Sequence, residues 1–332
     1  GGAGEEGRQE LRLMKVAVVE KVLRSIDESG FLKFDRVFAP LVGKEVQALP
    51  VKLEICSGDG EWVVAQASAD YEAASRAQTG GYSQVPKALW LSLELRCDRV
   101  QRTLVQQILS NPSLLTHSRE INNLAILGGD ASKILPSRIP PCSISAIFIN
   151  HPQPPERVAG AGFGGRDKNQ GAHLLTEGFF KDMGRVLKTH GTITIVTDNL
   201  SYAKTLAASV AAMPLLTGAS GAQERCLLVS GVDRQDSSRG DWDHALDDSH
   251  PCLAAQNTPL SPLHGSSVDV WRGEPGPEVG HIAAASSYFD RMWDLGQKKR
   301  RWIIFLRKAP LDPLGPQDPL DPVDPQDPQD PL

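Results

Sequence analysis

Short apolar runs alternate with helix-like segments along the chain between residues 51 and 308. Seven runs read as strands, and they are "VKLEIC", "ALWLSLEL", "NLAIL", "SAIFI", "TITIVTD", "RCLLVSG" and "RRWIIFLRK". Helical patterns such as "RCDRVQRTLVQQILS" and "LTEGFFKDMGRVLKTHG" stand between them. Continuously apolar strands separated by helices are typical of a mostly parallel sheet covered on both faces. The predicted fold class is therefore α/β and doubly wound.

Two stretches of the chain have a composition that cannot form a hydrophobic core. Residues 309–332 repeat Pro and Asp without any Lys or Arg, and residues 231–262 carry six Asp against two Arg among many Ser, Pro and Gly. We expect a disordered Asp/Pro-rich tail and an inserted, disordered surface loop. The predicted organisation is a partly helical N-terminal extension over residues 1–45, one domain over residues 46–308, and the tail.

These two acidic stretches mask the charge of the remainder. The formal net charge is -5, and it becomes +1 without the tail and +5 without the loop as well. A mildly basic domain is compatible with a nucleic-acid partner. The one basic cluster, "QKKRR" at residues 297–301, reads equally well as a phosphate contact or as a solvated entry to the last strand.

The cysteines and the apolar runs limit the cellular context. Five scattered cysteines without a CxxC spacing favour a reducing compartment and predict neither a disulfide framework nor a metal site. No apolar run approaches the roughly 18 residues of a membrane span, so we expect no membrane partner. Because the chain begins with Gly rather than Met, we expect its start to be incomplete, which leaves cytoplasm, nucleus or an organelle open.

Polar residues follow the strands at the positions where parallel sheets bind ligands. Gly58 and Gly60 in "EICSGDGEW" allow a tight turn close to a ligand, although an ordinary strand-to-helix turn would use them too. Glu94 in "LSLELR" could accept hydrogen bonds from a ribose diol or simply be solvated. Asp130 in "GGDA" is placed to accept from an exocyclic amine. Together they predict a pocket for an adenosine-bearing ligand.

Two glycine patterns and one histidine need separate interpretation. The chain has no GxxxxGK[ST], which argues against a nucleoside triphosphate, and "GAGFGG" at residues 160–165 follows "PPERVA" rather than a strand, so it reads as a flexible loop. His151 ends the strand in "SISAIFINHPQPPERV" and is hemmed in by prolines, which suits a rigidly held side chain. The alternative interpretation is that His151 is a rigid loop residue without a catalytic role.

The order of these motifs resembles the tRNA (guanine-N7)-methyltransferase family of S-adenosylmethionine enzymes. The resemblance covers about residues 51–203, is most specific in "LKTHGTITIVTDNLSYA", and has a weaker echo in "SSYFDR" at residues 286–291. It implies a class I, Rossmann-like methyltransferase fold with seven strands, S-adenosyl-L-methionine as the cofactor and tRNA or another RNA as the substrate. A WD-repeat partner subunit is implied for eukaryotic members.

The resemblance also implies roles for single residues. Glu54, Gly58 and Gly60 would lie along the methionine and ribose side of the cofactor, Glu94 would hold the ribose hydroxyls, and Asp130 the adenine amine.

On the substrate side, Thr197 and Asp198 would contact the guanine. The family motif T-x-x-E would be represented by Ser287 and Asp290 in "SYFD". Asp198 and His151 are the candidate catalytic residues, and His151 is also a candidate contact to the cofactor.

The chain departs from the family at the fourth strand. Aligned on its prolines, "NHPQPP" replaces P-D-P-W-P-K, so that His151 stands for the acid, Gln153 for the tryptophan and Pro155 for the lysine, while Cys56 replaces the first glycine of the cofactor turn. Guanine N7 carries a lone pair and no proton, so methyl transfer needs alignment and charge stabilisation but no base. A neutral His151 could still accept a hydrogen bond. A protonated one would oppose the cationic product, so activity should fall as pH drops.

Loss of the lysine and its basic run bears on the substrate. Phosphate contacts supply much of the affinity for nucleic acids, so fewer cations weaken RNA binding. Arg157, Arg166, Lys168 or the basic residues 298–301 could substitute in part. Three functions remain open: methyl transfer to guanine N7 of tRNA, a catalytically impaired binding module or partner subunit, and a methyltransferase with a non-RNA substrate.

Overall fold

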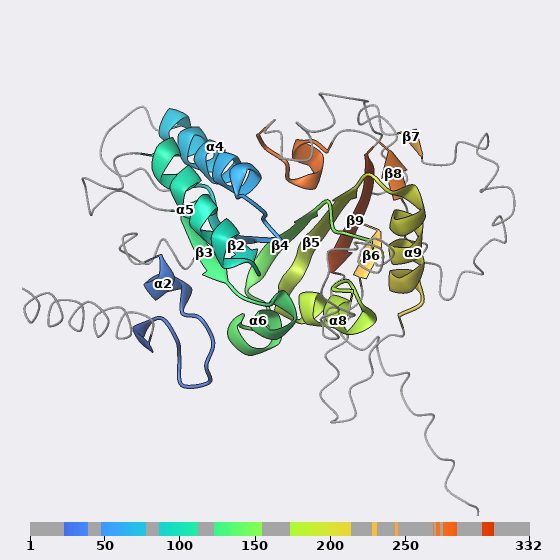
Figure 1. Ribbon diagram of the computed structural model, residues 1–332, viewed down its shortest axis with the longest axis horizontal. Helices are drawn as coiled ribbons and strands as arrows, with labels where there is room; N and C mark the ends of the chain where they lie inside the picture. The colour runs from blue at the N-terminus through green and yellow to red at the C-terminus, as the bar shows by residue number, and fades with distance from the viewer. Residues whose placement is uncertain are drawn as a thin grey trace, which may run out of the picture.

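A single mixed sheet forms the centre of the protein (Figure 1). The computed structural model describes residues 23–38, 48–77, 86–111, 123–154, 173–213, 228–230, 243–244, 268, 270–272, 275–283 and 301–308. The strands of its nine-stranded sheet are β1 (Val51–Ile55), β2 (Leu89–Glu94), β3 (Leu124–Gly128), β4 (Ile144–Asn150), β5 (Leu187–Thr197), β6 (Leu228–Ser230), β7 (Asp243–His244), β8 (Val270–Arg272) and β9 (Trp302–Lys308).

The strand order is that of a doubly wound sheet. The strands follow one another as β3-β2-β1-β4-β5-β9-β8-β7, and β6 also pairs with β9. Strands β1 to β5 are parallel to one another, whereas β9 is antiparallel to β5. The seven apolar runs supply β1 to β6 and β9, which confirms the predicted α/β, mostly parallel fold. Two short strands add to it, and one of them, β7, lies within the stretch interpreted as an inserted loop.

Helices cover both faces of the sheet (Figure 1). They are α2 (Phe34–Val37), α4 (Glu61–Ala77), α5 (Cys97–Ser110), α6 (Ala131–Arg138), α8 (Glu177–Val186) and α9 (Leu200–Ala211), with the 3-10 turn η2 (Pro277–Val279). Side chains alternate between the two faces along each strand. Leu89 and Leu91 therefore join a cluster with α6, α8 and α9, whereas Trp90 joins a second cluster with α4. Of the described helices, none has the length and apolarity that crossing a bilayer demands.

One predicted helix is shorter than its pattern suggested. The pattern over residues 175–191 predicted a helix, but α8 ends at Val186 and the last five residues open strand β5. Leu187 is fully buried and pairs with Ile144 of β4. Gly191 lies where a Cβ would be 2.8 Å from a backbone carbonyl oxygen, so this position is built for a tight lead-in to the strand. Strand pairing overrode the helical periodicity here.

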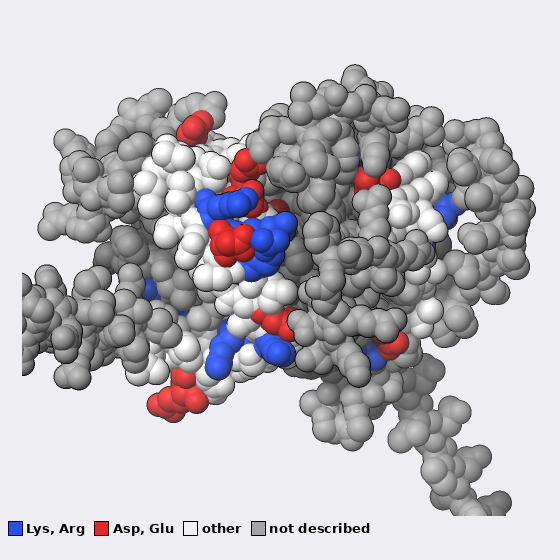
Figure 2. All heavy atoms as spheres, viewed as in Figure 1, with Lys and Arg blue, Asp and Glu red and all other residues white. Residues whose placement is uncertain are grey.

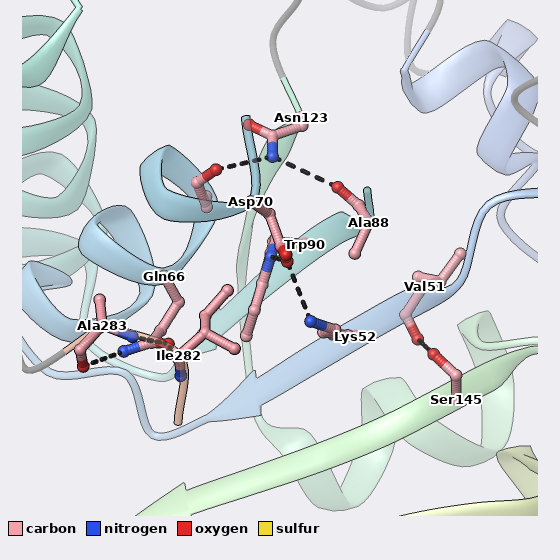
Figure 3. Close-up of polar contacts among 11 residues, drawn as sticks. Val51, Lys52, Gln66, Asp70, Ala88, Trp90, Asn123, Ser145, Ile282 and Ala283 are labelled. Carbon is pink, nitrogen blue, oxygen red and sulfur yellow. Dashed lines mark hydrogen bonds and ion pairs between the residues drawn. The ribbon is translucent and has the colours of Figure 1, made fainter. Parts of the chain in front are cut away.

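The segment over residues 275–283, called here the docked segment, lies on helix α4 (Figure 3). The side chain of Gln66 accepts from the backbone N–H of Ile282 at 2.8 Å and of Ala283 at 3.1 Å, and its amide donates to the carbonyl of Ala283 at 2.9 Å. His281 of the same segment packs on Trp62, with ring centroids 4.7 Å apart. Three hydrogen bonds from one side chain thus tie a distant part of the chain to α4.

A buried carboxylate links α4 to the sheet (Figure 3). Asp70 accepts from the ammonium group of Lys52 at 2.9 Å and from the indole N–H of Trp90 at 2.8 Å. The same ammonium group lies 4.8 Å from the centre of the Trp90 ring. Because Lys52 neutralises the carboxylate and Trp90 donates a hydrogen bond to it, its burial is tolerated. This network fixes the helix whose first turn borders the candidate site.

Candidate functional site

A cavity of about 210 Å³ opens where β1, β2 and β4 end. Four of the candidate site residues line it, and they come from two separate parts of the chain: Glu54, Gly58 and Gly60 from β1 and the turn after it, and His151 from the end of β4. Such a position, at the carboxyl edge of a doubly wound sheet, is where ligands bind in this fold class. Its other lining residues are Cys56, Ser57, Asp59, Glu61, Trp62, Arg96, Arg99, Arg102 and Asn150.

Glu54 is the most perturbed acid of the cavity. It is 2% exposed, and one of its oxygens accepts from the side-chain amide of Asn150 at 2.9 Å. Burial raises the pKa of Glu54 from 4.5 to about 8, against the hydrogen bond from Asn150, and the charge of Glu94 adds to the rise. Among the described residues, Glu54 Oε2 and Asn150 Oδ1 are buried without a hydrogen-bond partner. Two buried acceptors that share one cavity are suited to a cationic donor.

Glu94 supports the glycine turn through hydrogen bonds to backbone N–H groups. Its carboxylate accepts from the backbone N–H of Gly58 at 2.9 Å and from that of Arg96 at 3.0 Å, and the residue is 4% exposed. It does not itself line the cavity. Gly58 and Gly60 have φ of 60° and 80°, which favours glycine at both positions. A Cβ on Gly58 would meet nothing within 4 Å, whereas one on Gly60 would be 2.3 Å from Thr103. Gly58 therefore leaves open space beside Glu94.

Two residues other than glycine adopt left-handed backbone at the cavity. Cys56 has φ of 61° and His151 has φ of 53°. The backbone N–H of Cys56 donates to Leu93 at 2.8 Å, and that of His151 to Val196 at 2.7 Å, so each is held by the neighbouring strand. Strained backbone of this kind is uncommon and concentrates at ligand sites. The backbone of His151 is thus held at the end of β4.

Asp130 and Thr197 lie at the same edge of the sheet but outside the cavity lining. Asp130 caps helix α6 by accepting from the backbone N–H of Ser132 at 3.0 Å and from its hydroxyl at 2.7 Å. Thr197 ends β5 fully buried and accepts from the backbone N–H of Asn199 at 3.2 Å.

Asp198 follows Thr197 directly and does not line the cavity either. Ser287, Asp290 and Pro155 lie outside the described residues, as do Arg157, Arg166 and Lys168. Within the described ranges, no three His, Cys, Asp or Glu side chains gather in a way that could hold a metal ion.

The structure adds lining residues that the sequence did not single out. Asn150 and Trp62 border the cavity from β4 and α4, and three arginines border it from the start of α5. The spacing of Arg96, Arg99 and Arg102 was the available signal, because residues three apart share one side of a helix. An exposed helical charge pattern is usually a solvated face, so this spacing alone does not indicate a site.

Comparisons with known proteins identify the family. Residues 48–227 match the family model described as "Putative methyltransferase". The chain belongs to this methyltransferase family. Among curated proteins, it is 29% identical over 153 residues to the tRNA (guanine-N(7)-)-methyltransferase of Chlamydia muridarum (strain MoPn / Nigg), covering 46% of this chain and 54% of that protein. The resemblance expected from the motifs is confirmed.

Further relatives carry the same name or a related description. The tRNA (guanine-N(7)-)-methyltransferase of Chlamydia pneumoniae is 26% identical over 152 residues, covering 46% of this chain and 53% of that protein. The methyltransferase chain thus spans about half the length of the curated relatives it matches. The crystal structure of the 16S rRNA methyltransferase KamB is 14% identical with a TM-score of 0.38, covering 86% of this chain and 95% of that one. The fold assignment rests on the strand order rather than on that score.

Proposed function

We propose that this protein transfers a methyl group from S-adenosylmethionine to N7 of a guanine in tRNA. The observation that carries the proposal is the pair of buried acids at the carboxyl edge of the sheet. Glu54 faces the cavity with an oxygen that has no partner among the described residues, and Glu94 lies behind the glycine turn. This arrangement stands in a chain of a methyltransferase family.

The residues at the cavity suit the proposed cofactor. S-adenosylmethionine carries an ammonium group, a sulfonium and a ribose diol. Glu54 and Asn150 offer buried acceptors to a cationic donor. Gly58 leaves room for the ligand to approach its backbone, and Glu94 retains acceptor capacity beyond its two backbone hydrogen bonds. Asp130, at the end of the neighbouring strand, supports the adenine assignment by position alone.

Methyl transfer to guanine N7 requires the protein mainly to align the guanine with the methyl group. When bound, S-adenosylmethionine supplies a methyl group on a sulfonium. N7 of guanine attacks with a lone pair that bears no proton, so no residue has to act as a base. A neutral His151, held rigidly on the cavity wall, would accept a hydrogen bond from the guanine edge or from an ammonium group. Thr197 and Asp198 at the end of β5 are the proposed guanine contacts.

Incubation of the protein with isotope-labelled cofactor and total tRNA tests the proposal. We expect label in tRNA, with the methyl group mapped to guanine N7 by its sensitivity to chemical cleavage. Isothermal titration should show cofactor binding that Glu94→Ala weakens strongly and Asp130→Ala weakens to a smaller degree. No cofactor binding by the parent protein would contradict the proposal.

A non-catalytic binding module is the second candidate. His151 in place of the family acid and Cys56 in place of the family glycine favour it. Cofactor binding without label in any RNA would support this candidate. Label in a protein or metabolite pool but never in RNA would instead indicate a methyltransferase with another substrate.

A further inference from the structure

Charged side chains of both signs line the cavity: the acids Glu54, Asp59 and Glu61, and a basic rim of Arg96, Arg99 and Arg102. Glu54 lies at the floor, and Glu94 lies behind the turn next to it. Arg96, Arg99 and Arg102 form the wall on the side of α5. The interior suits a cationic cofactor, but a cation gains nothing from three guanidinium groups. The rim therefore points to a second, anionic ligand.

The three arginines stand in a regular row. Arg96 immediately precedes α5, and Arg99 and Arg102 follow at intervals of three residues along the first two turns. At a rise of 1.5 Å per residue, the row is about 9 Å long. The side chains of Arg96 and Arg102 are 59% and 62% exposed. On the face shown in Figure 2, basic side chains with acidic ones among them gather near one end of α5.

Aspartates hold two of these arginines in place. The guanidinium group of Arg96 donates two hydrogen bonds, of 3.0 and 2.8 Å, to the carboxylate of Asp98. That of Arg102 donates one to the carboxylate of Asp59 at 3.0 Å. Such exposed pairs are weak because water screens them, so a phosphate can replace the aspartate. Arginine suits this exchange, because its planar fork donates two hydrogen bonds to one phosphate.

We propose that Arg96, Arg99 and Arg102 form a binding stripe for the phosphate backbone of the RNA substrate, at the mouth of the cofactor cavity. The inference rests on the proposed function and names the surface that holds its acceptor. A row about 9 Å long can contact neighbouring phosphates of a polynucleotide, whereas a cofactor offers it a single carboxylate. The stripe also supplies cations close to the site. This chain needs such cations because the basic run that the family has after β4 is displaced here.

The test compares a triple variant with the parent protein. Arg96→Gln, Arg99→Gln and Arg102→Gln are combined, and tRNA binding is measured over a series of salt concentrations. We expect affinity at low salt to fall by roughly tenfold or more and the slope of log affinity against log salt to lose about two units. Affinity for the cofactor, measured by titration, should stay within about twofold.

A matched control uses an arginine away from the cavity. Arg36 of α2 has a 65% exposed side chain beside Asp35, as the stripe arginines have aspartate neighbours. Arg36→Gln should leave RNA affinity and salt slope unchanged. Equal RNA binding by the triple variant and the parent overturns the stripe, and so does a parallel loss of cofactor affinity. A parent protein that binds tRNA through the stripe but transfers no methyl group refutes the proposed function and leaves the stripe intact.

Discussion

The side-chain amide of Asn150 donates to the buried carboxylate of Glu54 over 2.9 Å, although the two residues are 96 positions apart in the chain. Asn150 ends β4 and Glu54 lies in the neighbouring strand β1. Parallel pairing brings both to the same edge of the sheet. The pair lies at the floor of the cavity, where burial raises the pKa of Glu54 against the hydrogen bond from Asn150.

Glu54 should make stability depend on pH. Its folded-state pKa of about 8 is above its ordinary value of 4.5, so between these values the folded protein holds a proton that the unfolded chain has released. Stability should therefore fall as pH rises from 4.5 to 8, by up to about 5 kcal/mol. Glu54→Gln should remove this contribution. Denaturant unfolding from pH 5 to 8.5 measures both proteins, and parallel curves would contradict the assignment.

Cofactor binding should involve the same proton. A cation beside Glu54 favours its carboxylate form, so we expect proton release on binding and an affinity that rises as pH approaches 8. Titration calorimetry in buffers of different ionisation enthalpy measures the released proton. Glu54→Gln should bind without releasing it. Release of the same size in the variant would place the titrating group elsewhere.

Substitution by alanine should lower stability by different amounts at the two glycines of the turn. Gly58→Ala meets open space and should cost only the left-handed backbone strain, about 1–2 kcal/mol. Gly60→Ala also collides with Thr103 and should cost more. Cofactor affinity should drop sharply in Gly58→Ala despite its modest loss of stability, because its methyl group occupies ligand space. Thermal unfolding and titration together check this, and full affinity in Gly58→Ala would show that no ligand approaches there.

Cys56 should be a site where glycine stabilises the protein. Its φ of 61° strains any residue with a Cβ, so Cys56→Gly should gain up to about 1 kcal/mol in the free energy of unfolding. Cys56→Ala keeps the Cβ and serves as the matched control, without the gain. The comparison is made by denaturant unfolding. A stabilised alanine variant would attribute the effect to the thiol instead of the backbone.

Gln66 should control the docked segment. Gln66→Leu leaves the N–H groups of Ile282 and Ala283 without their acceptor, so hydrogen exchange at these two amides should accelerate by at least tenfold. Gln107→Leu is the control, because Gln107 also donates from a helix to a backbone carbonyl, that of Leu124, at 3.0 Å. That variant should lose stability without selective exchange at residues 282 and 283. Equal exchange in both variants would mean that Gln66 is not the anchor.

The helix predicted over residues 175–191 shows where local pattern stops being informative. The apolar spacing continues past Val186, but the chain turns into β5 because Leu187 pairs with Ile144 and fills the core. Periodicity reports which side chains are buried; it does not report whether a strand partner is near. Only the neighbouring strand decided the boundary.

The sequence by itself determined seven of the nine strands, the glycine turn and the acids at the strand ends. Each depends on residues that are close in the chain, such as the continuous apolar runs and the glycines that permit positive φ. The tertiary structure decided which of these residues share a cavity. It brought Asn150 to Glu54, turned the arginines of α5 toward the same space, and tied Ala283 to Gln66 across 217 positions. Such contacts depend on strand order and helix orientation, which no short stretch of sequence contains.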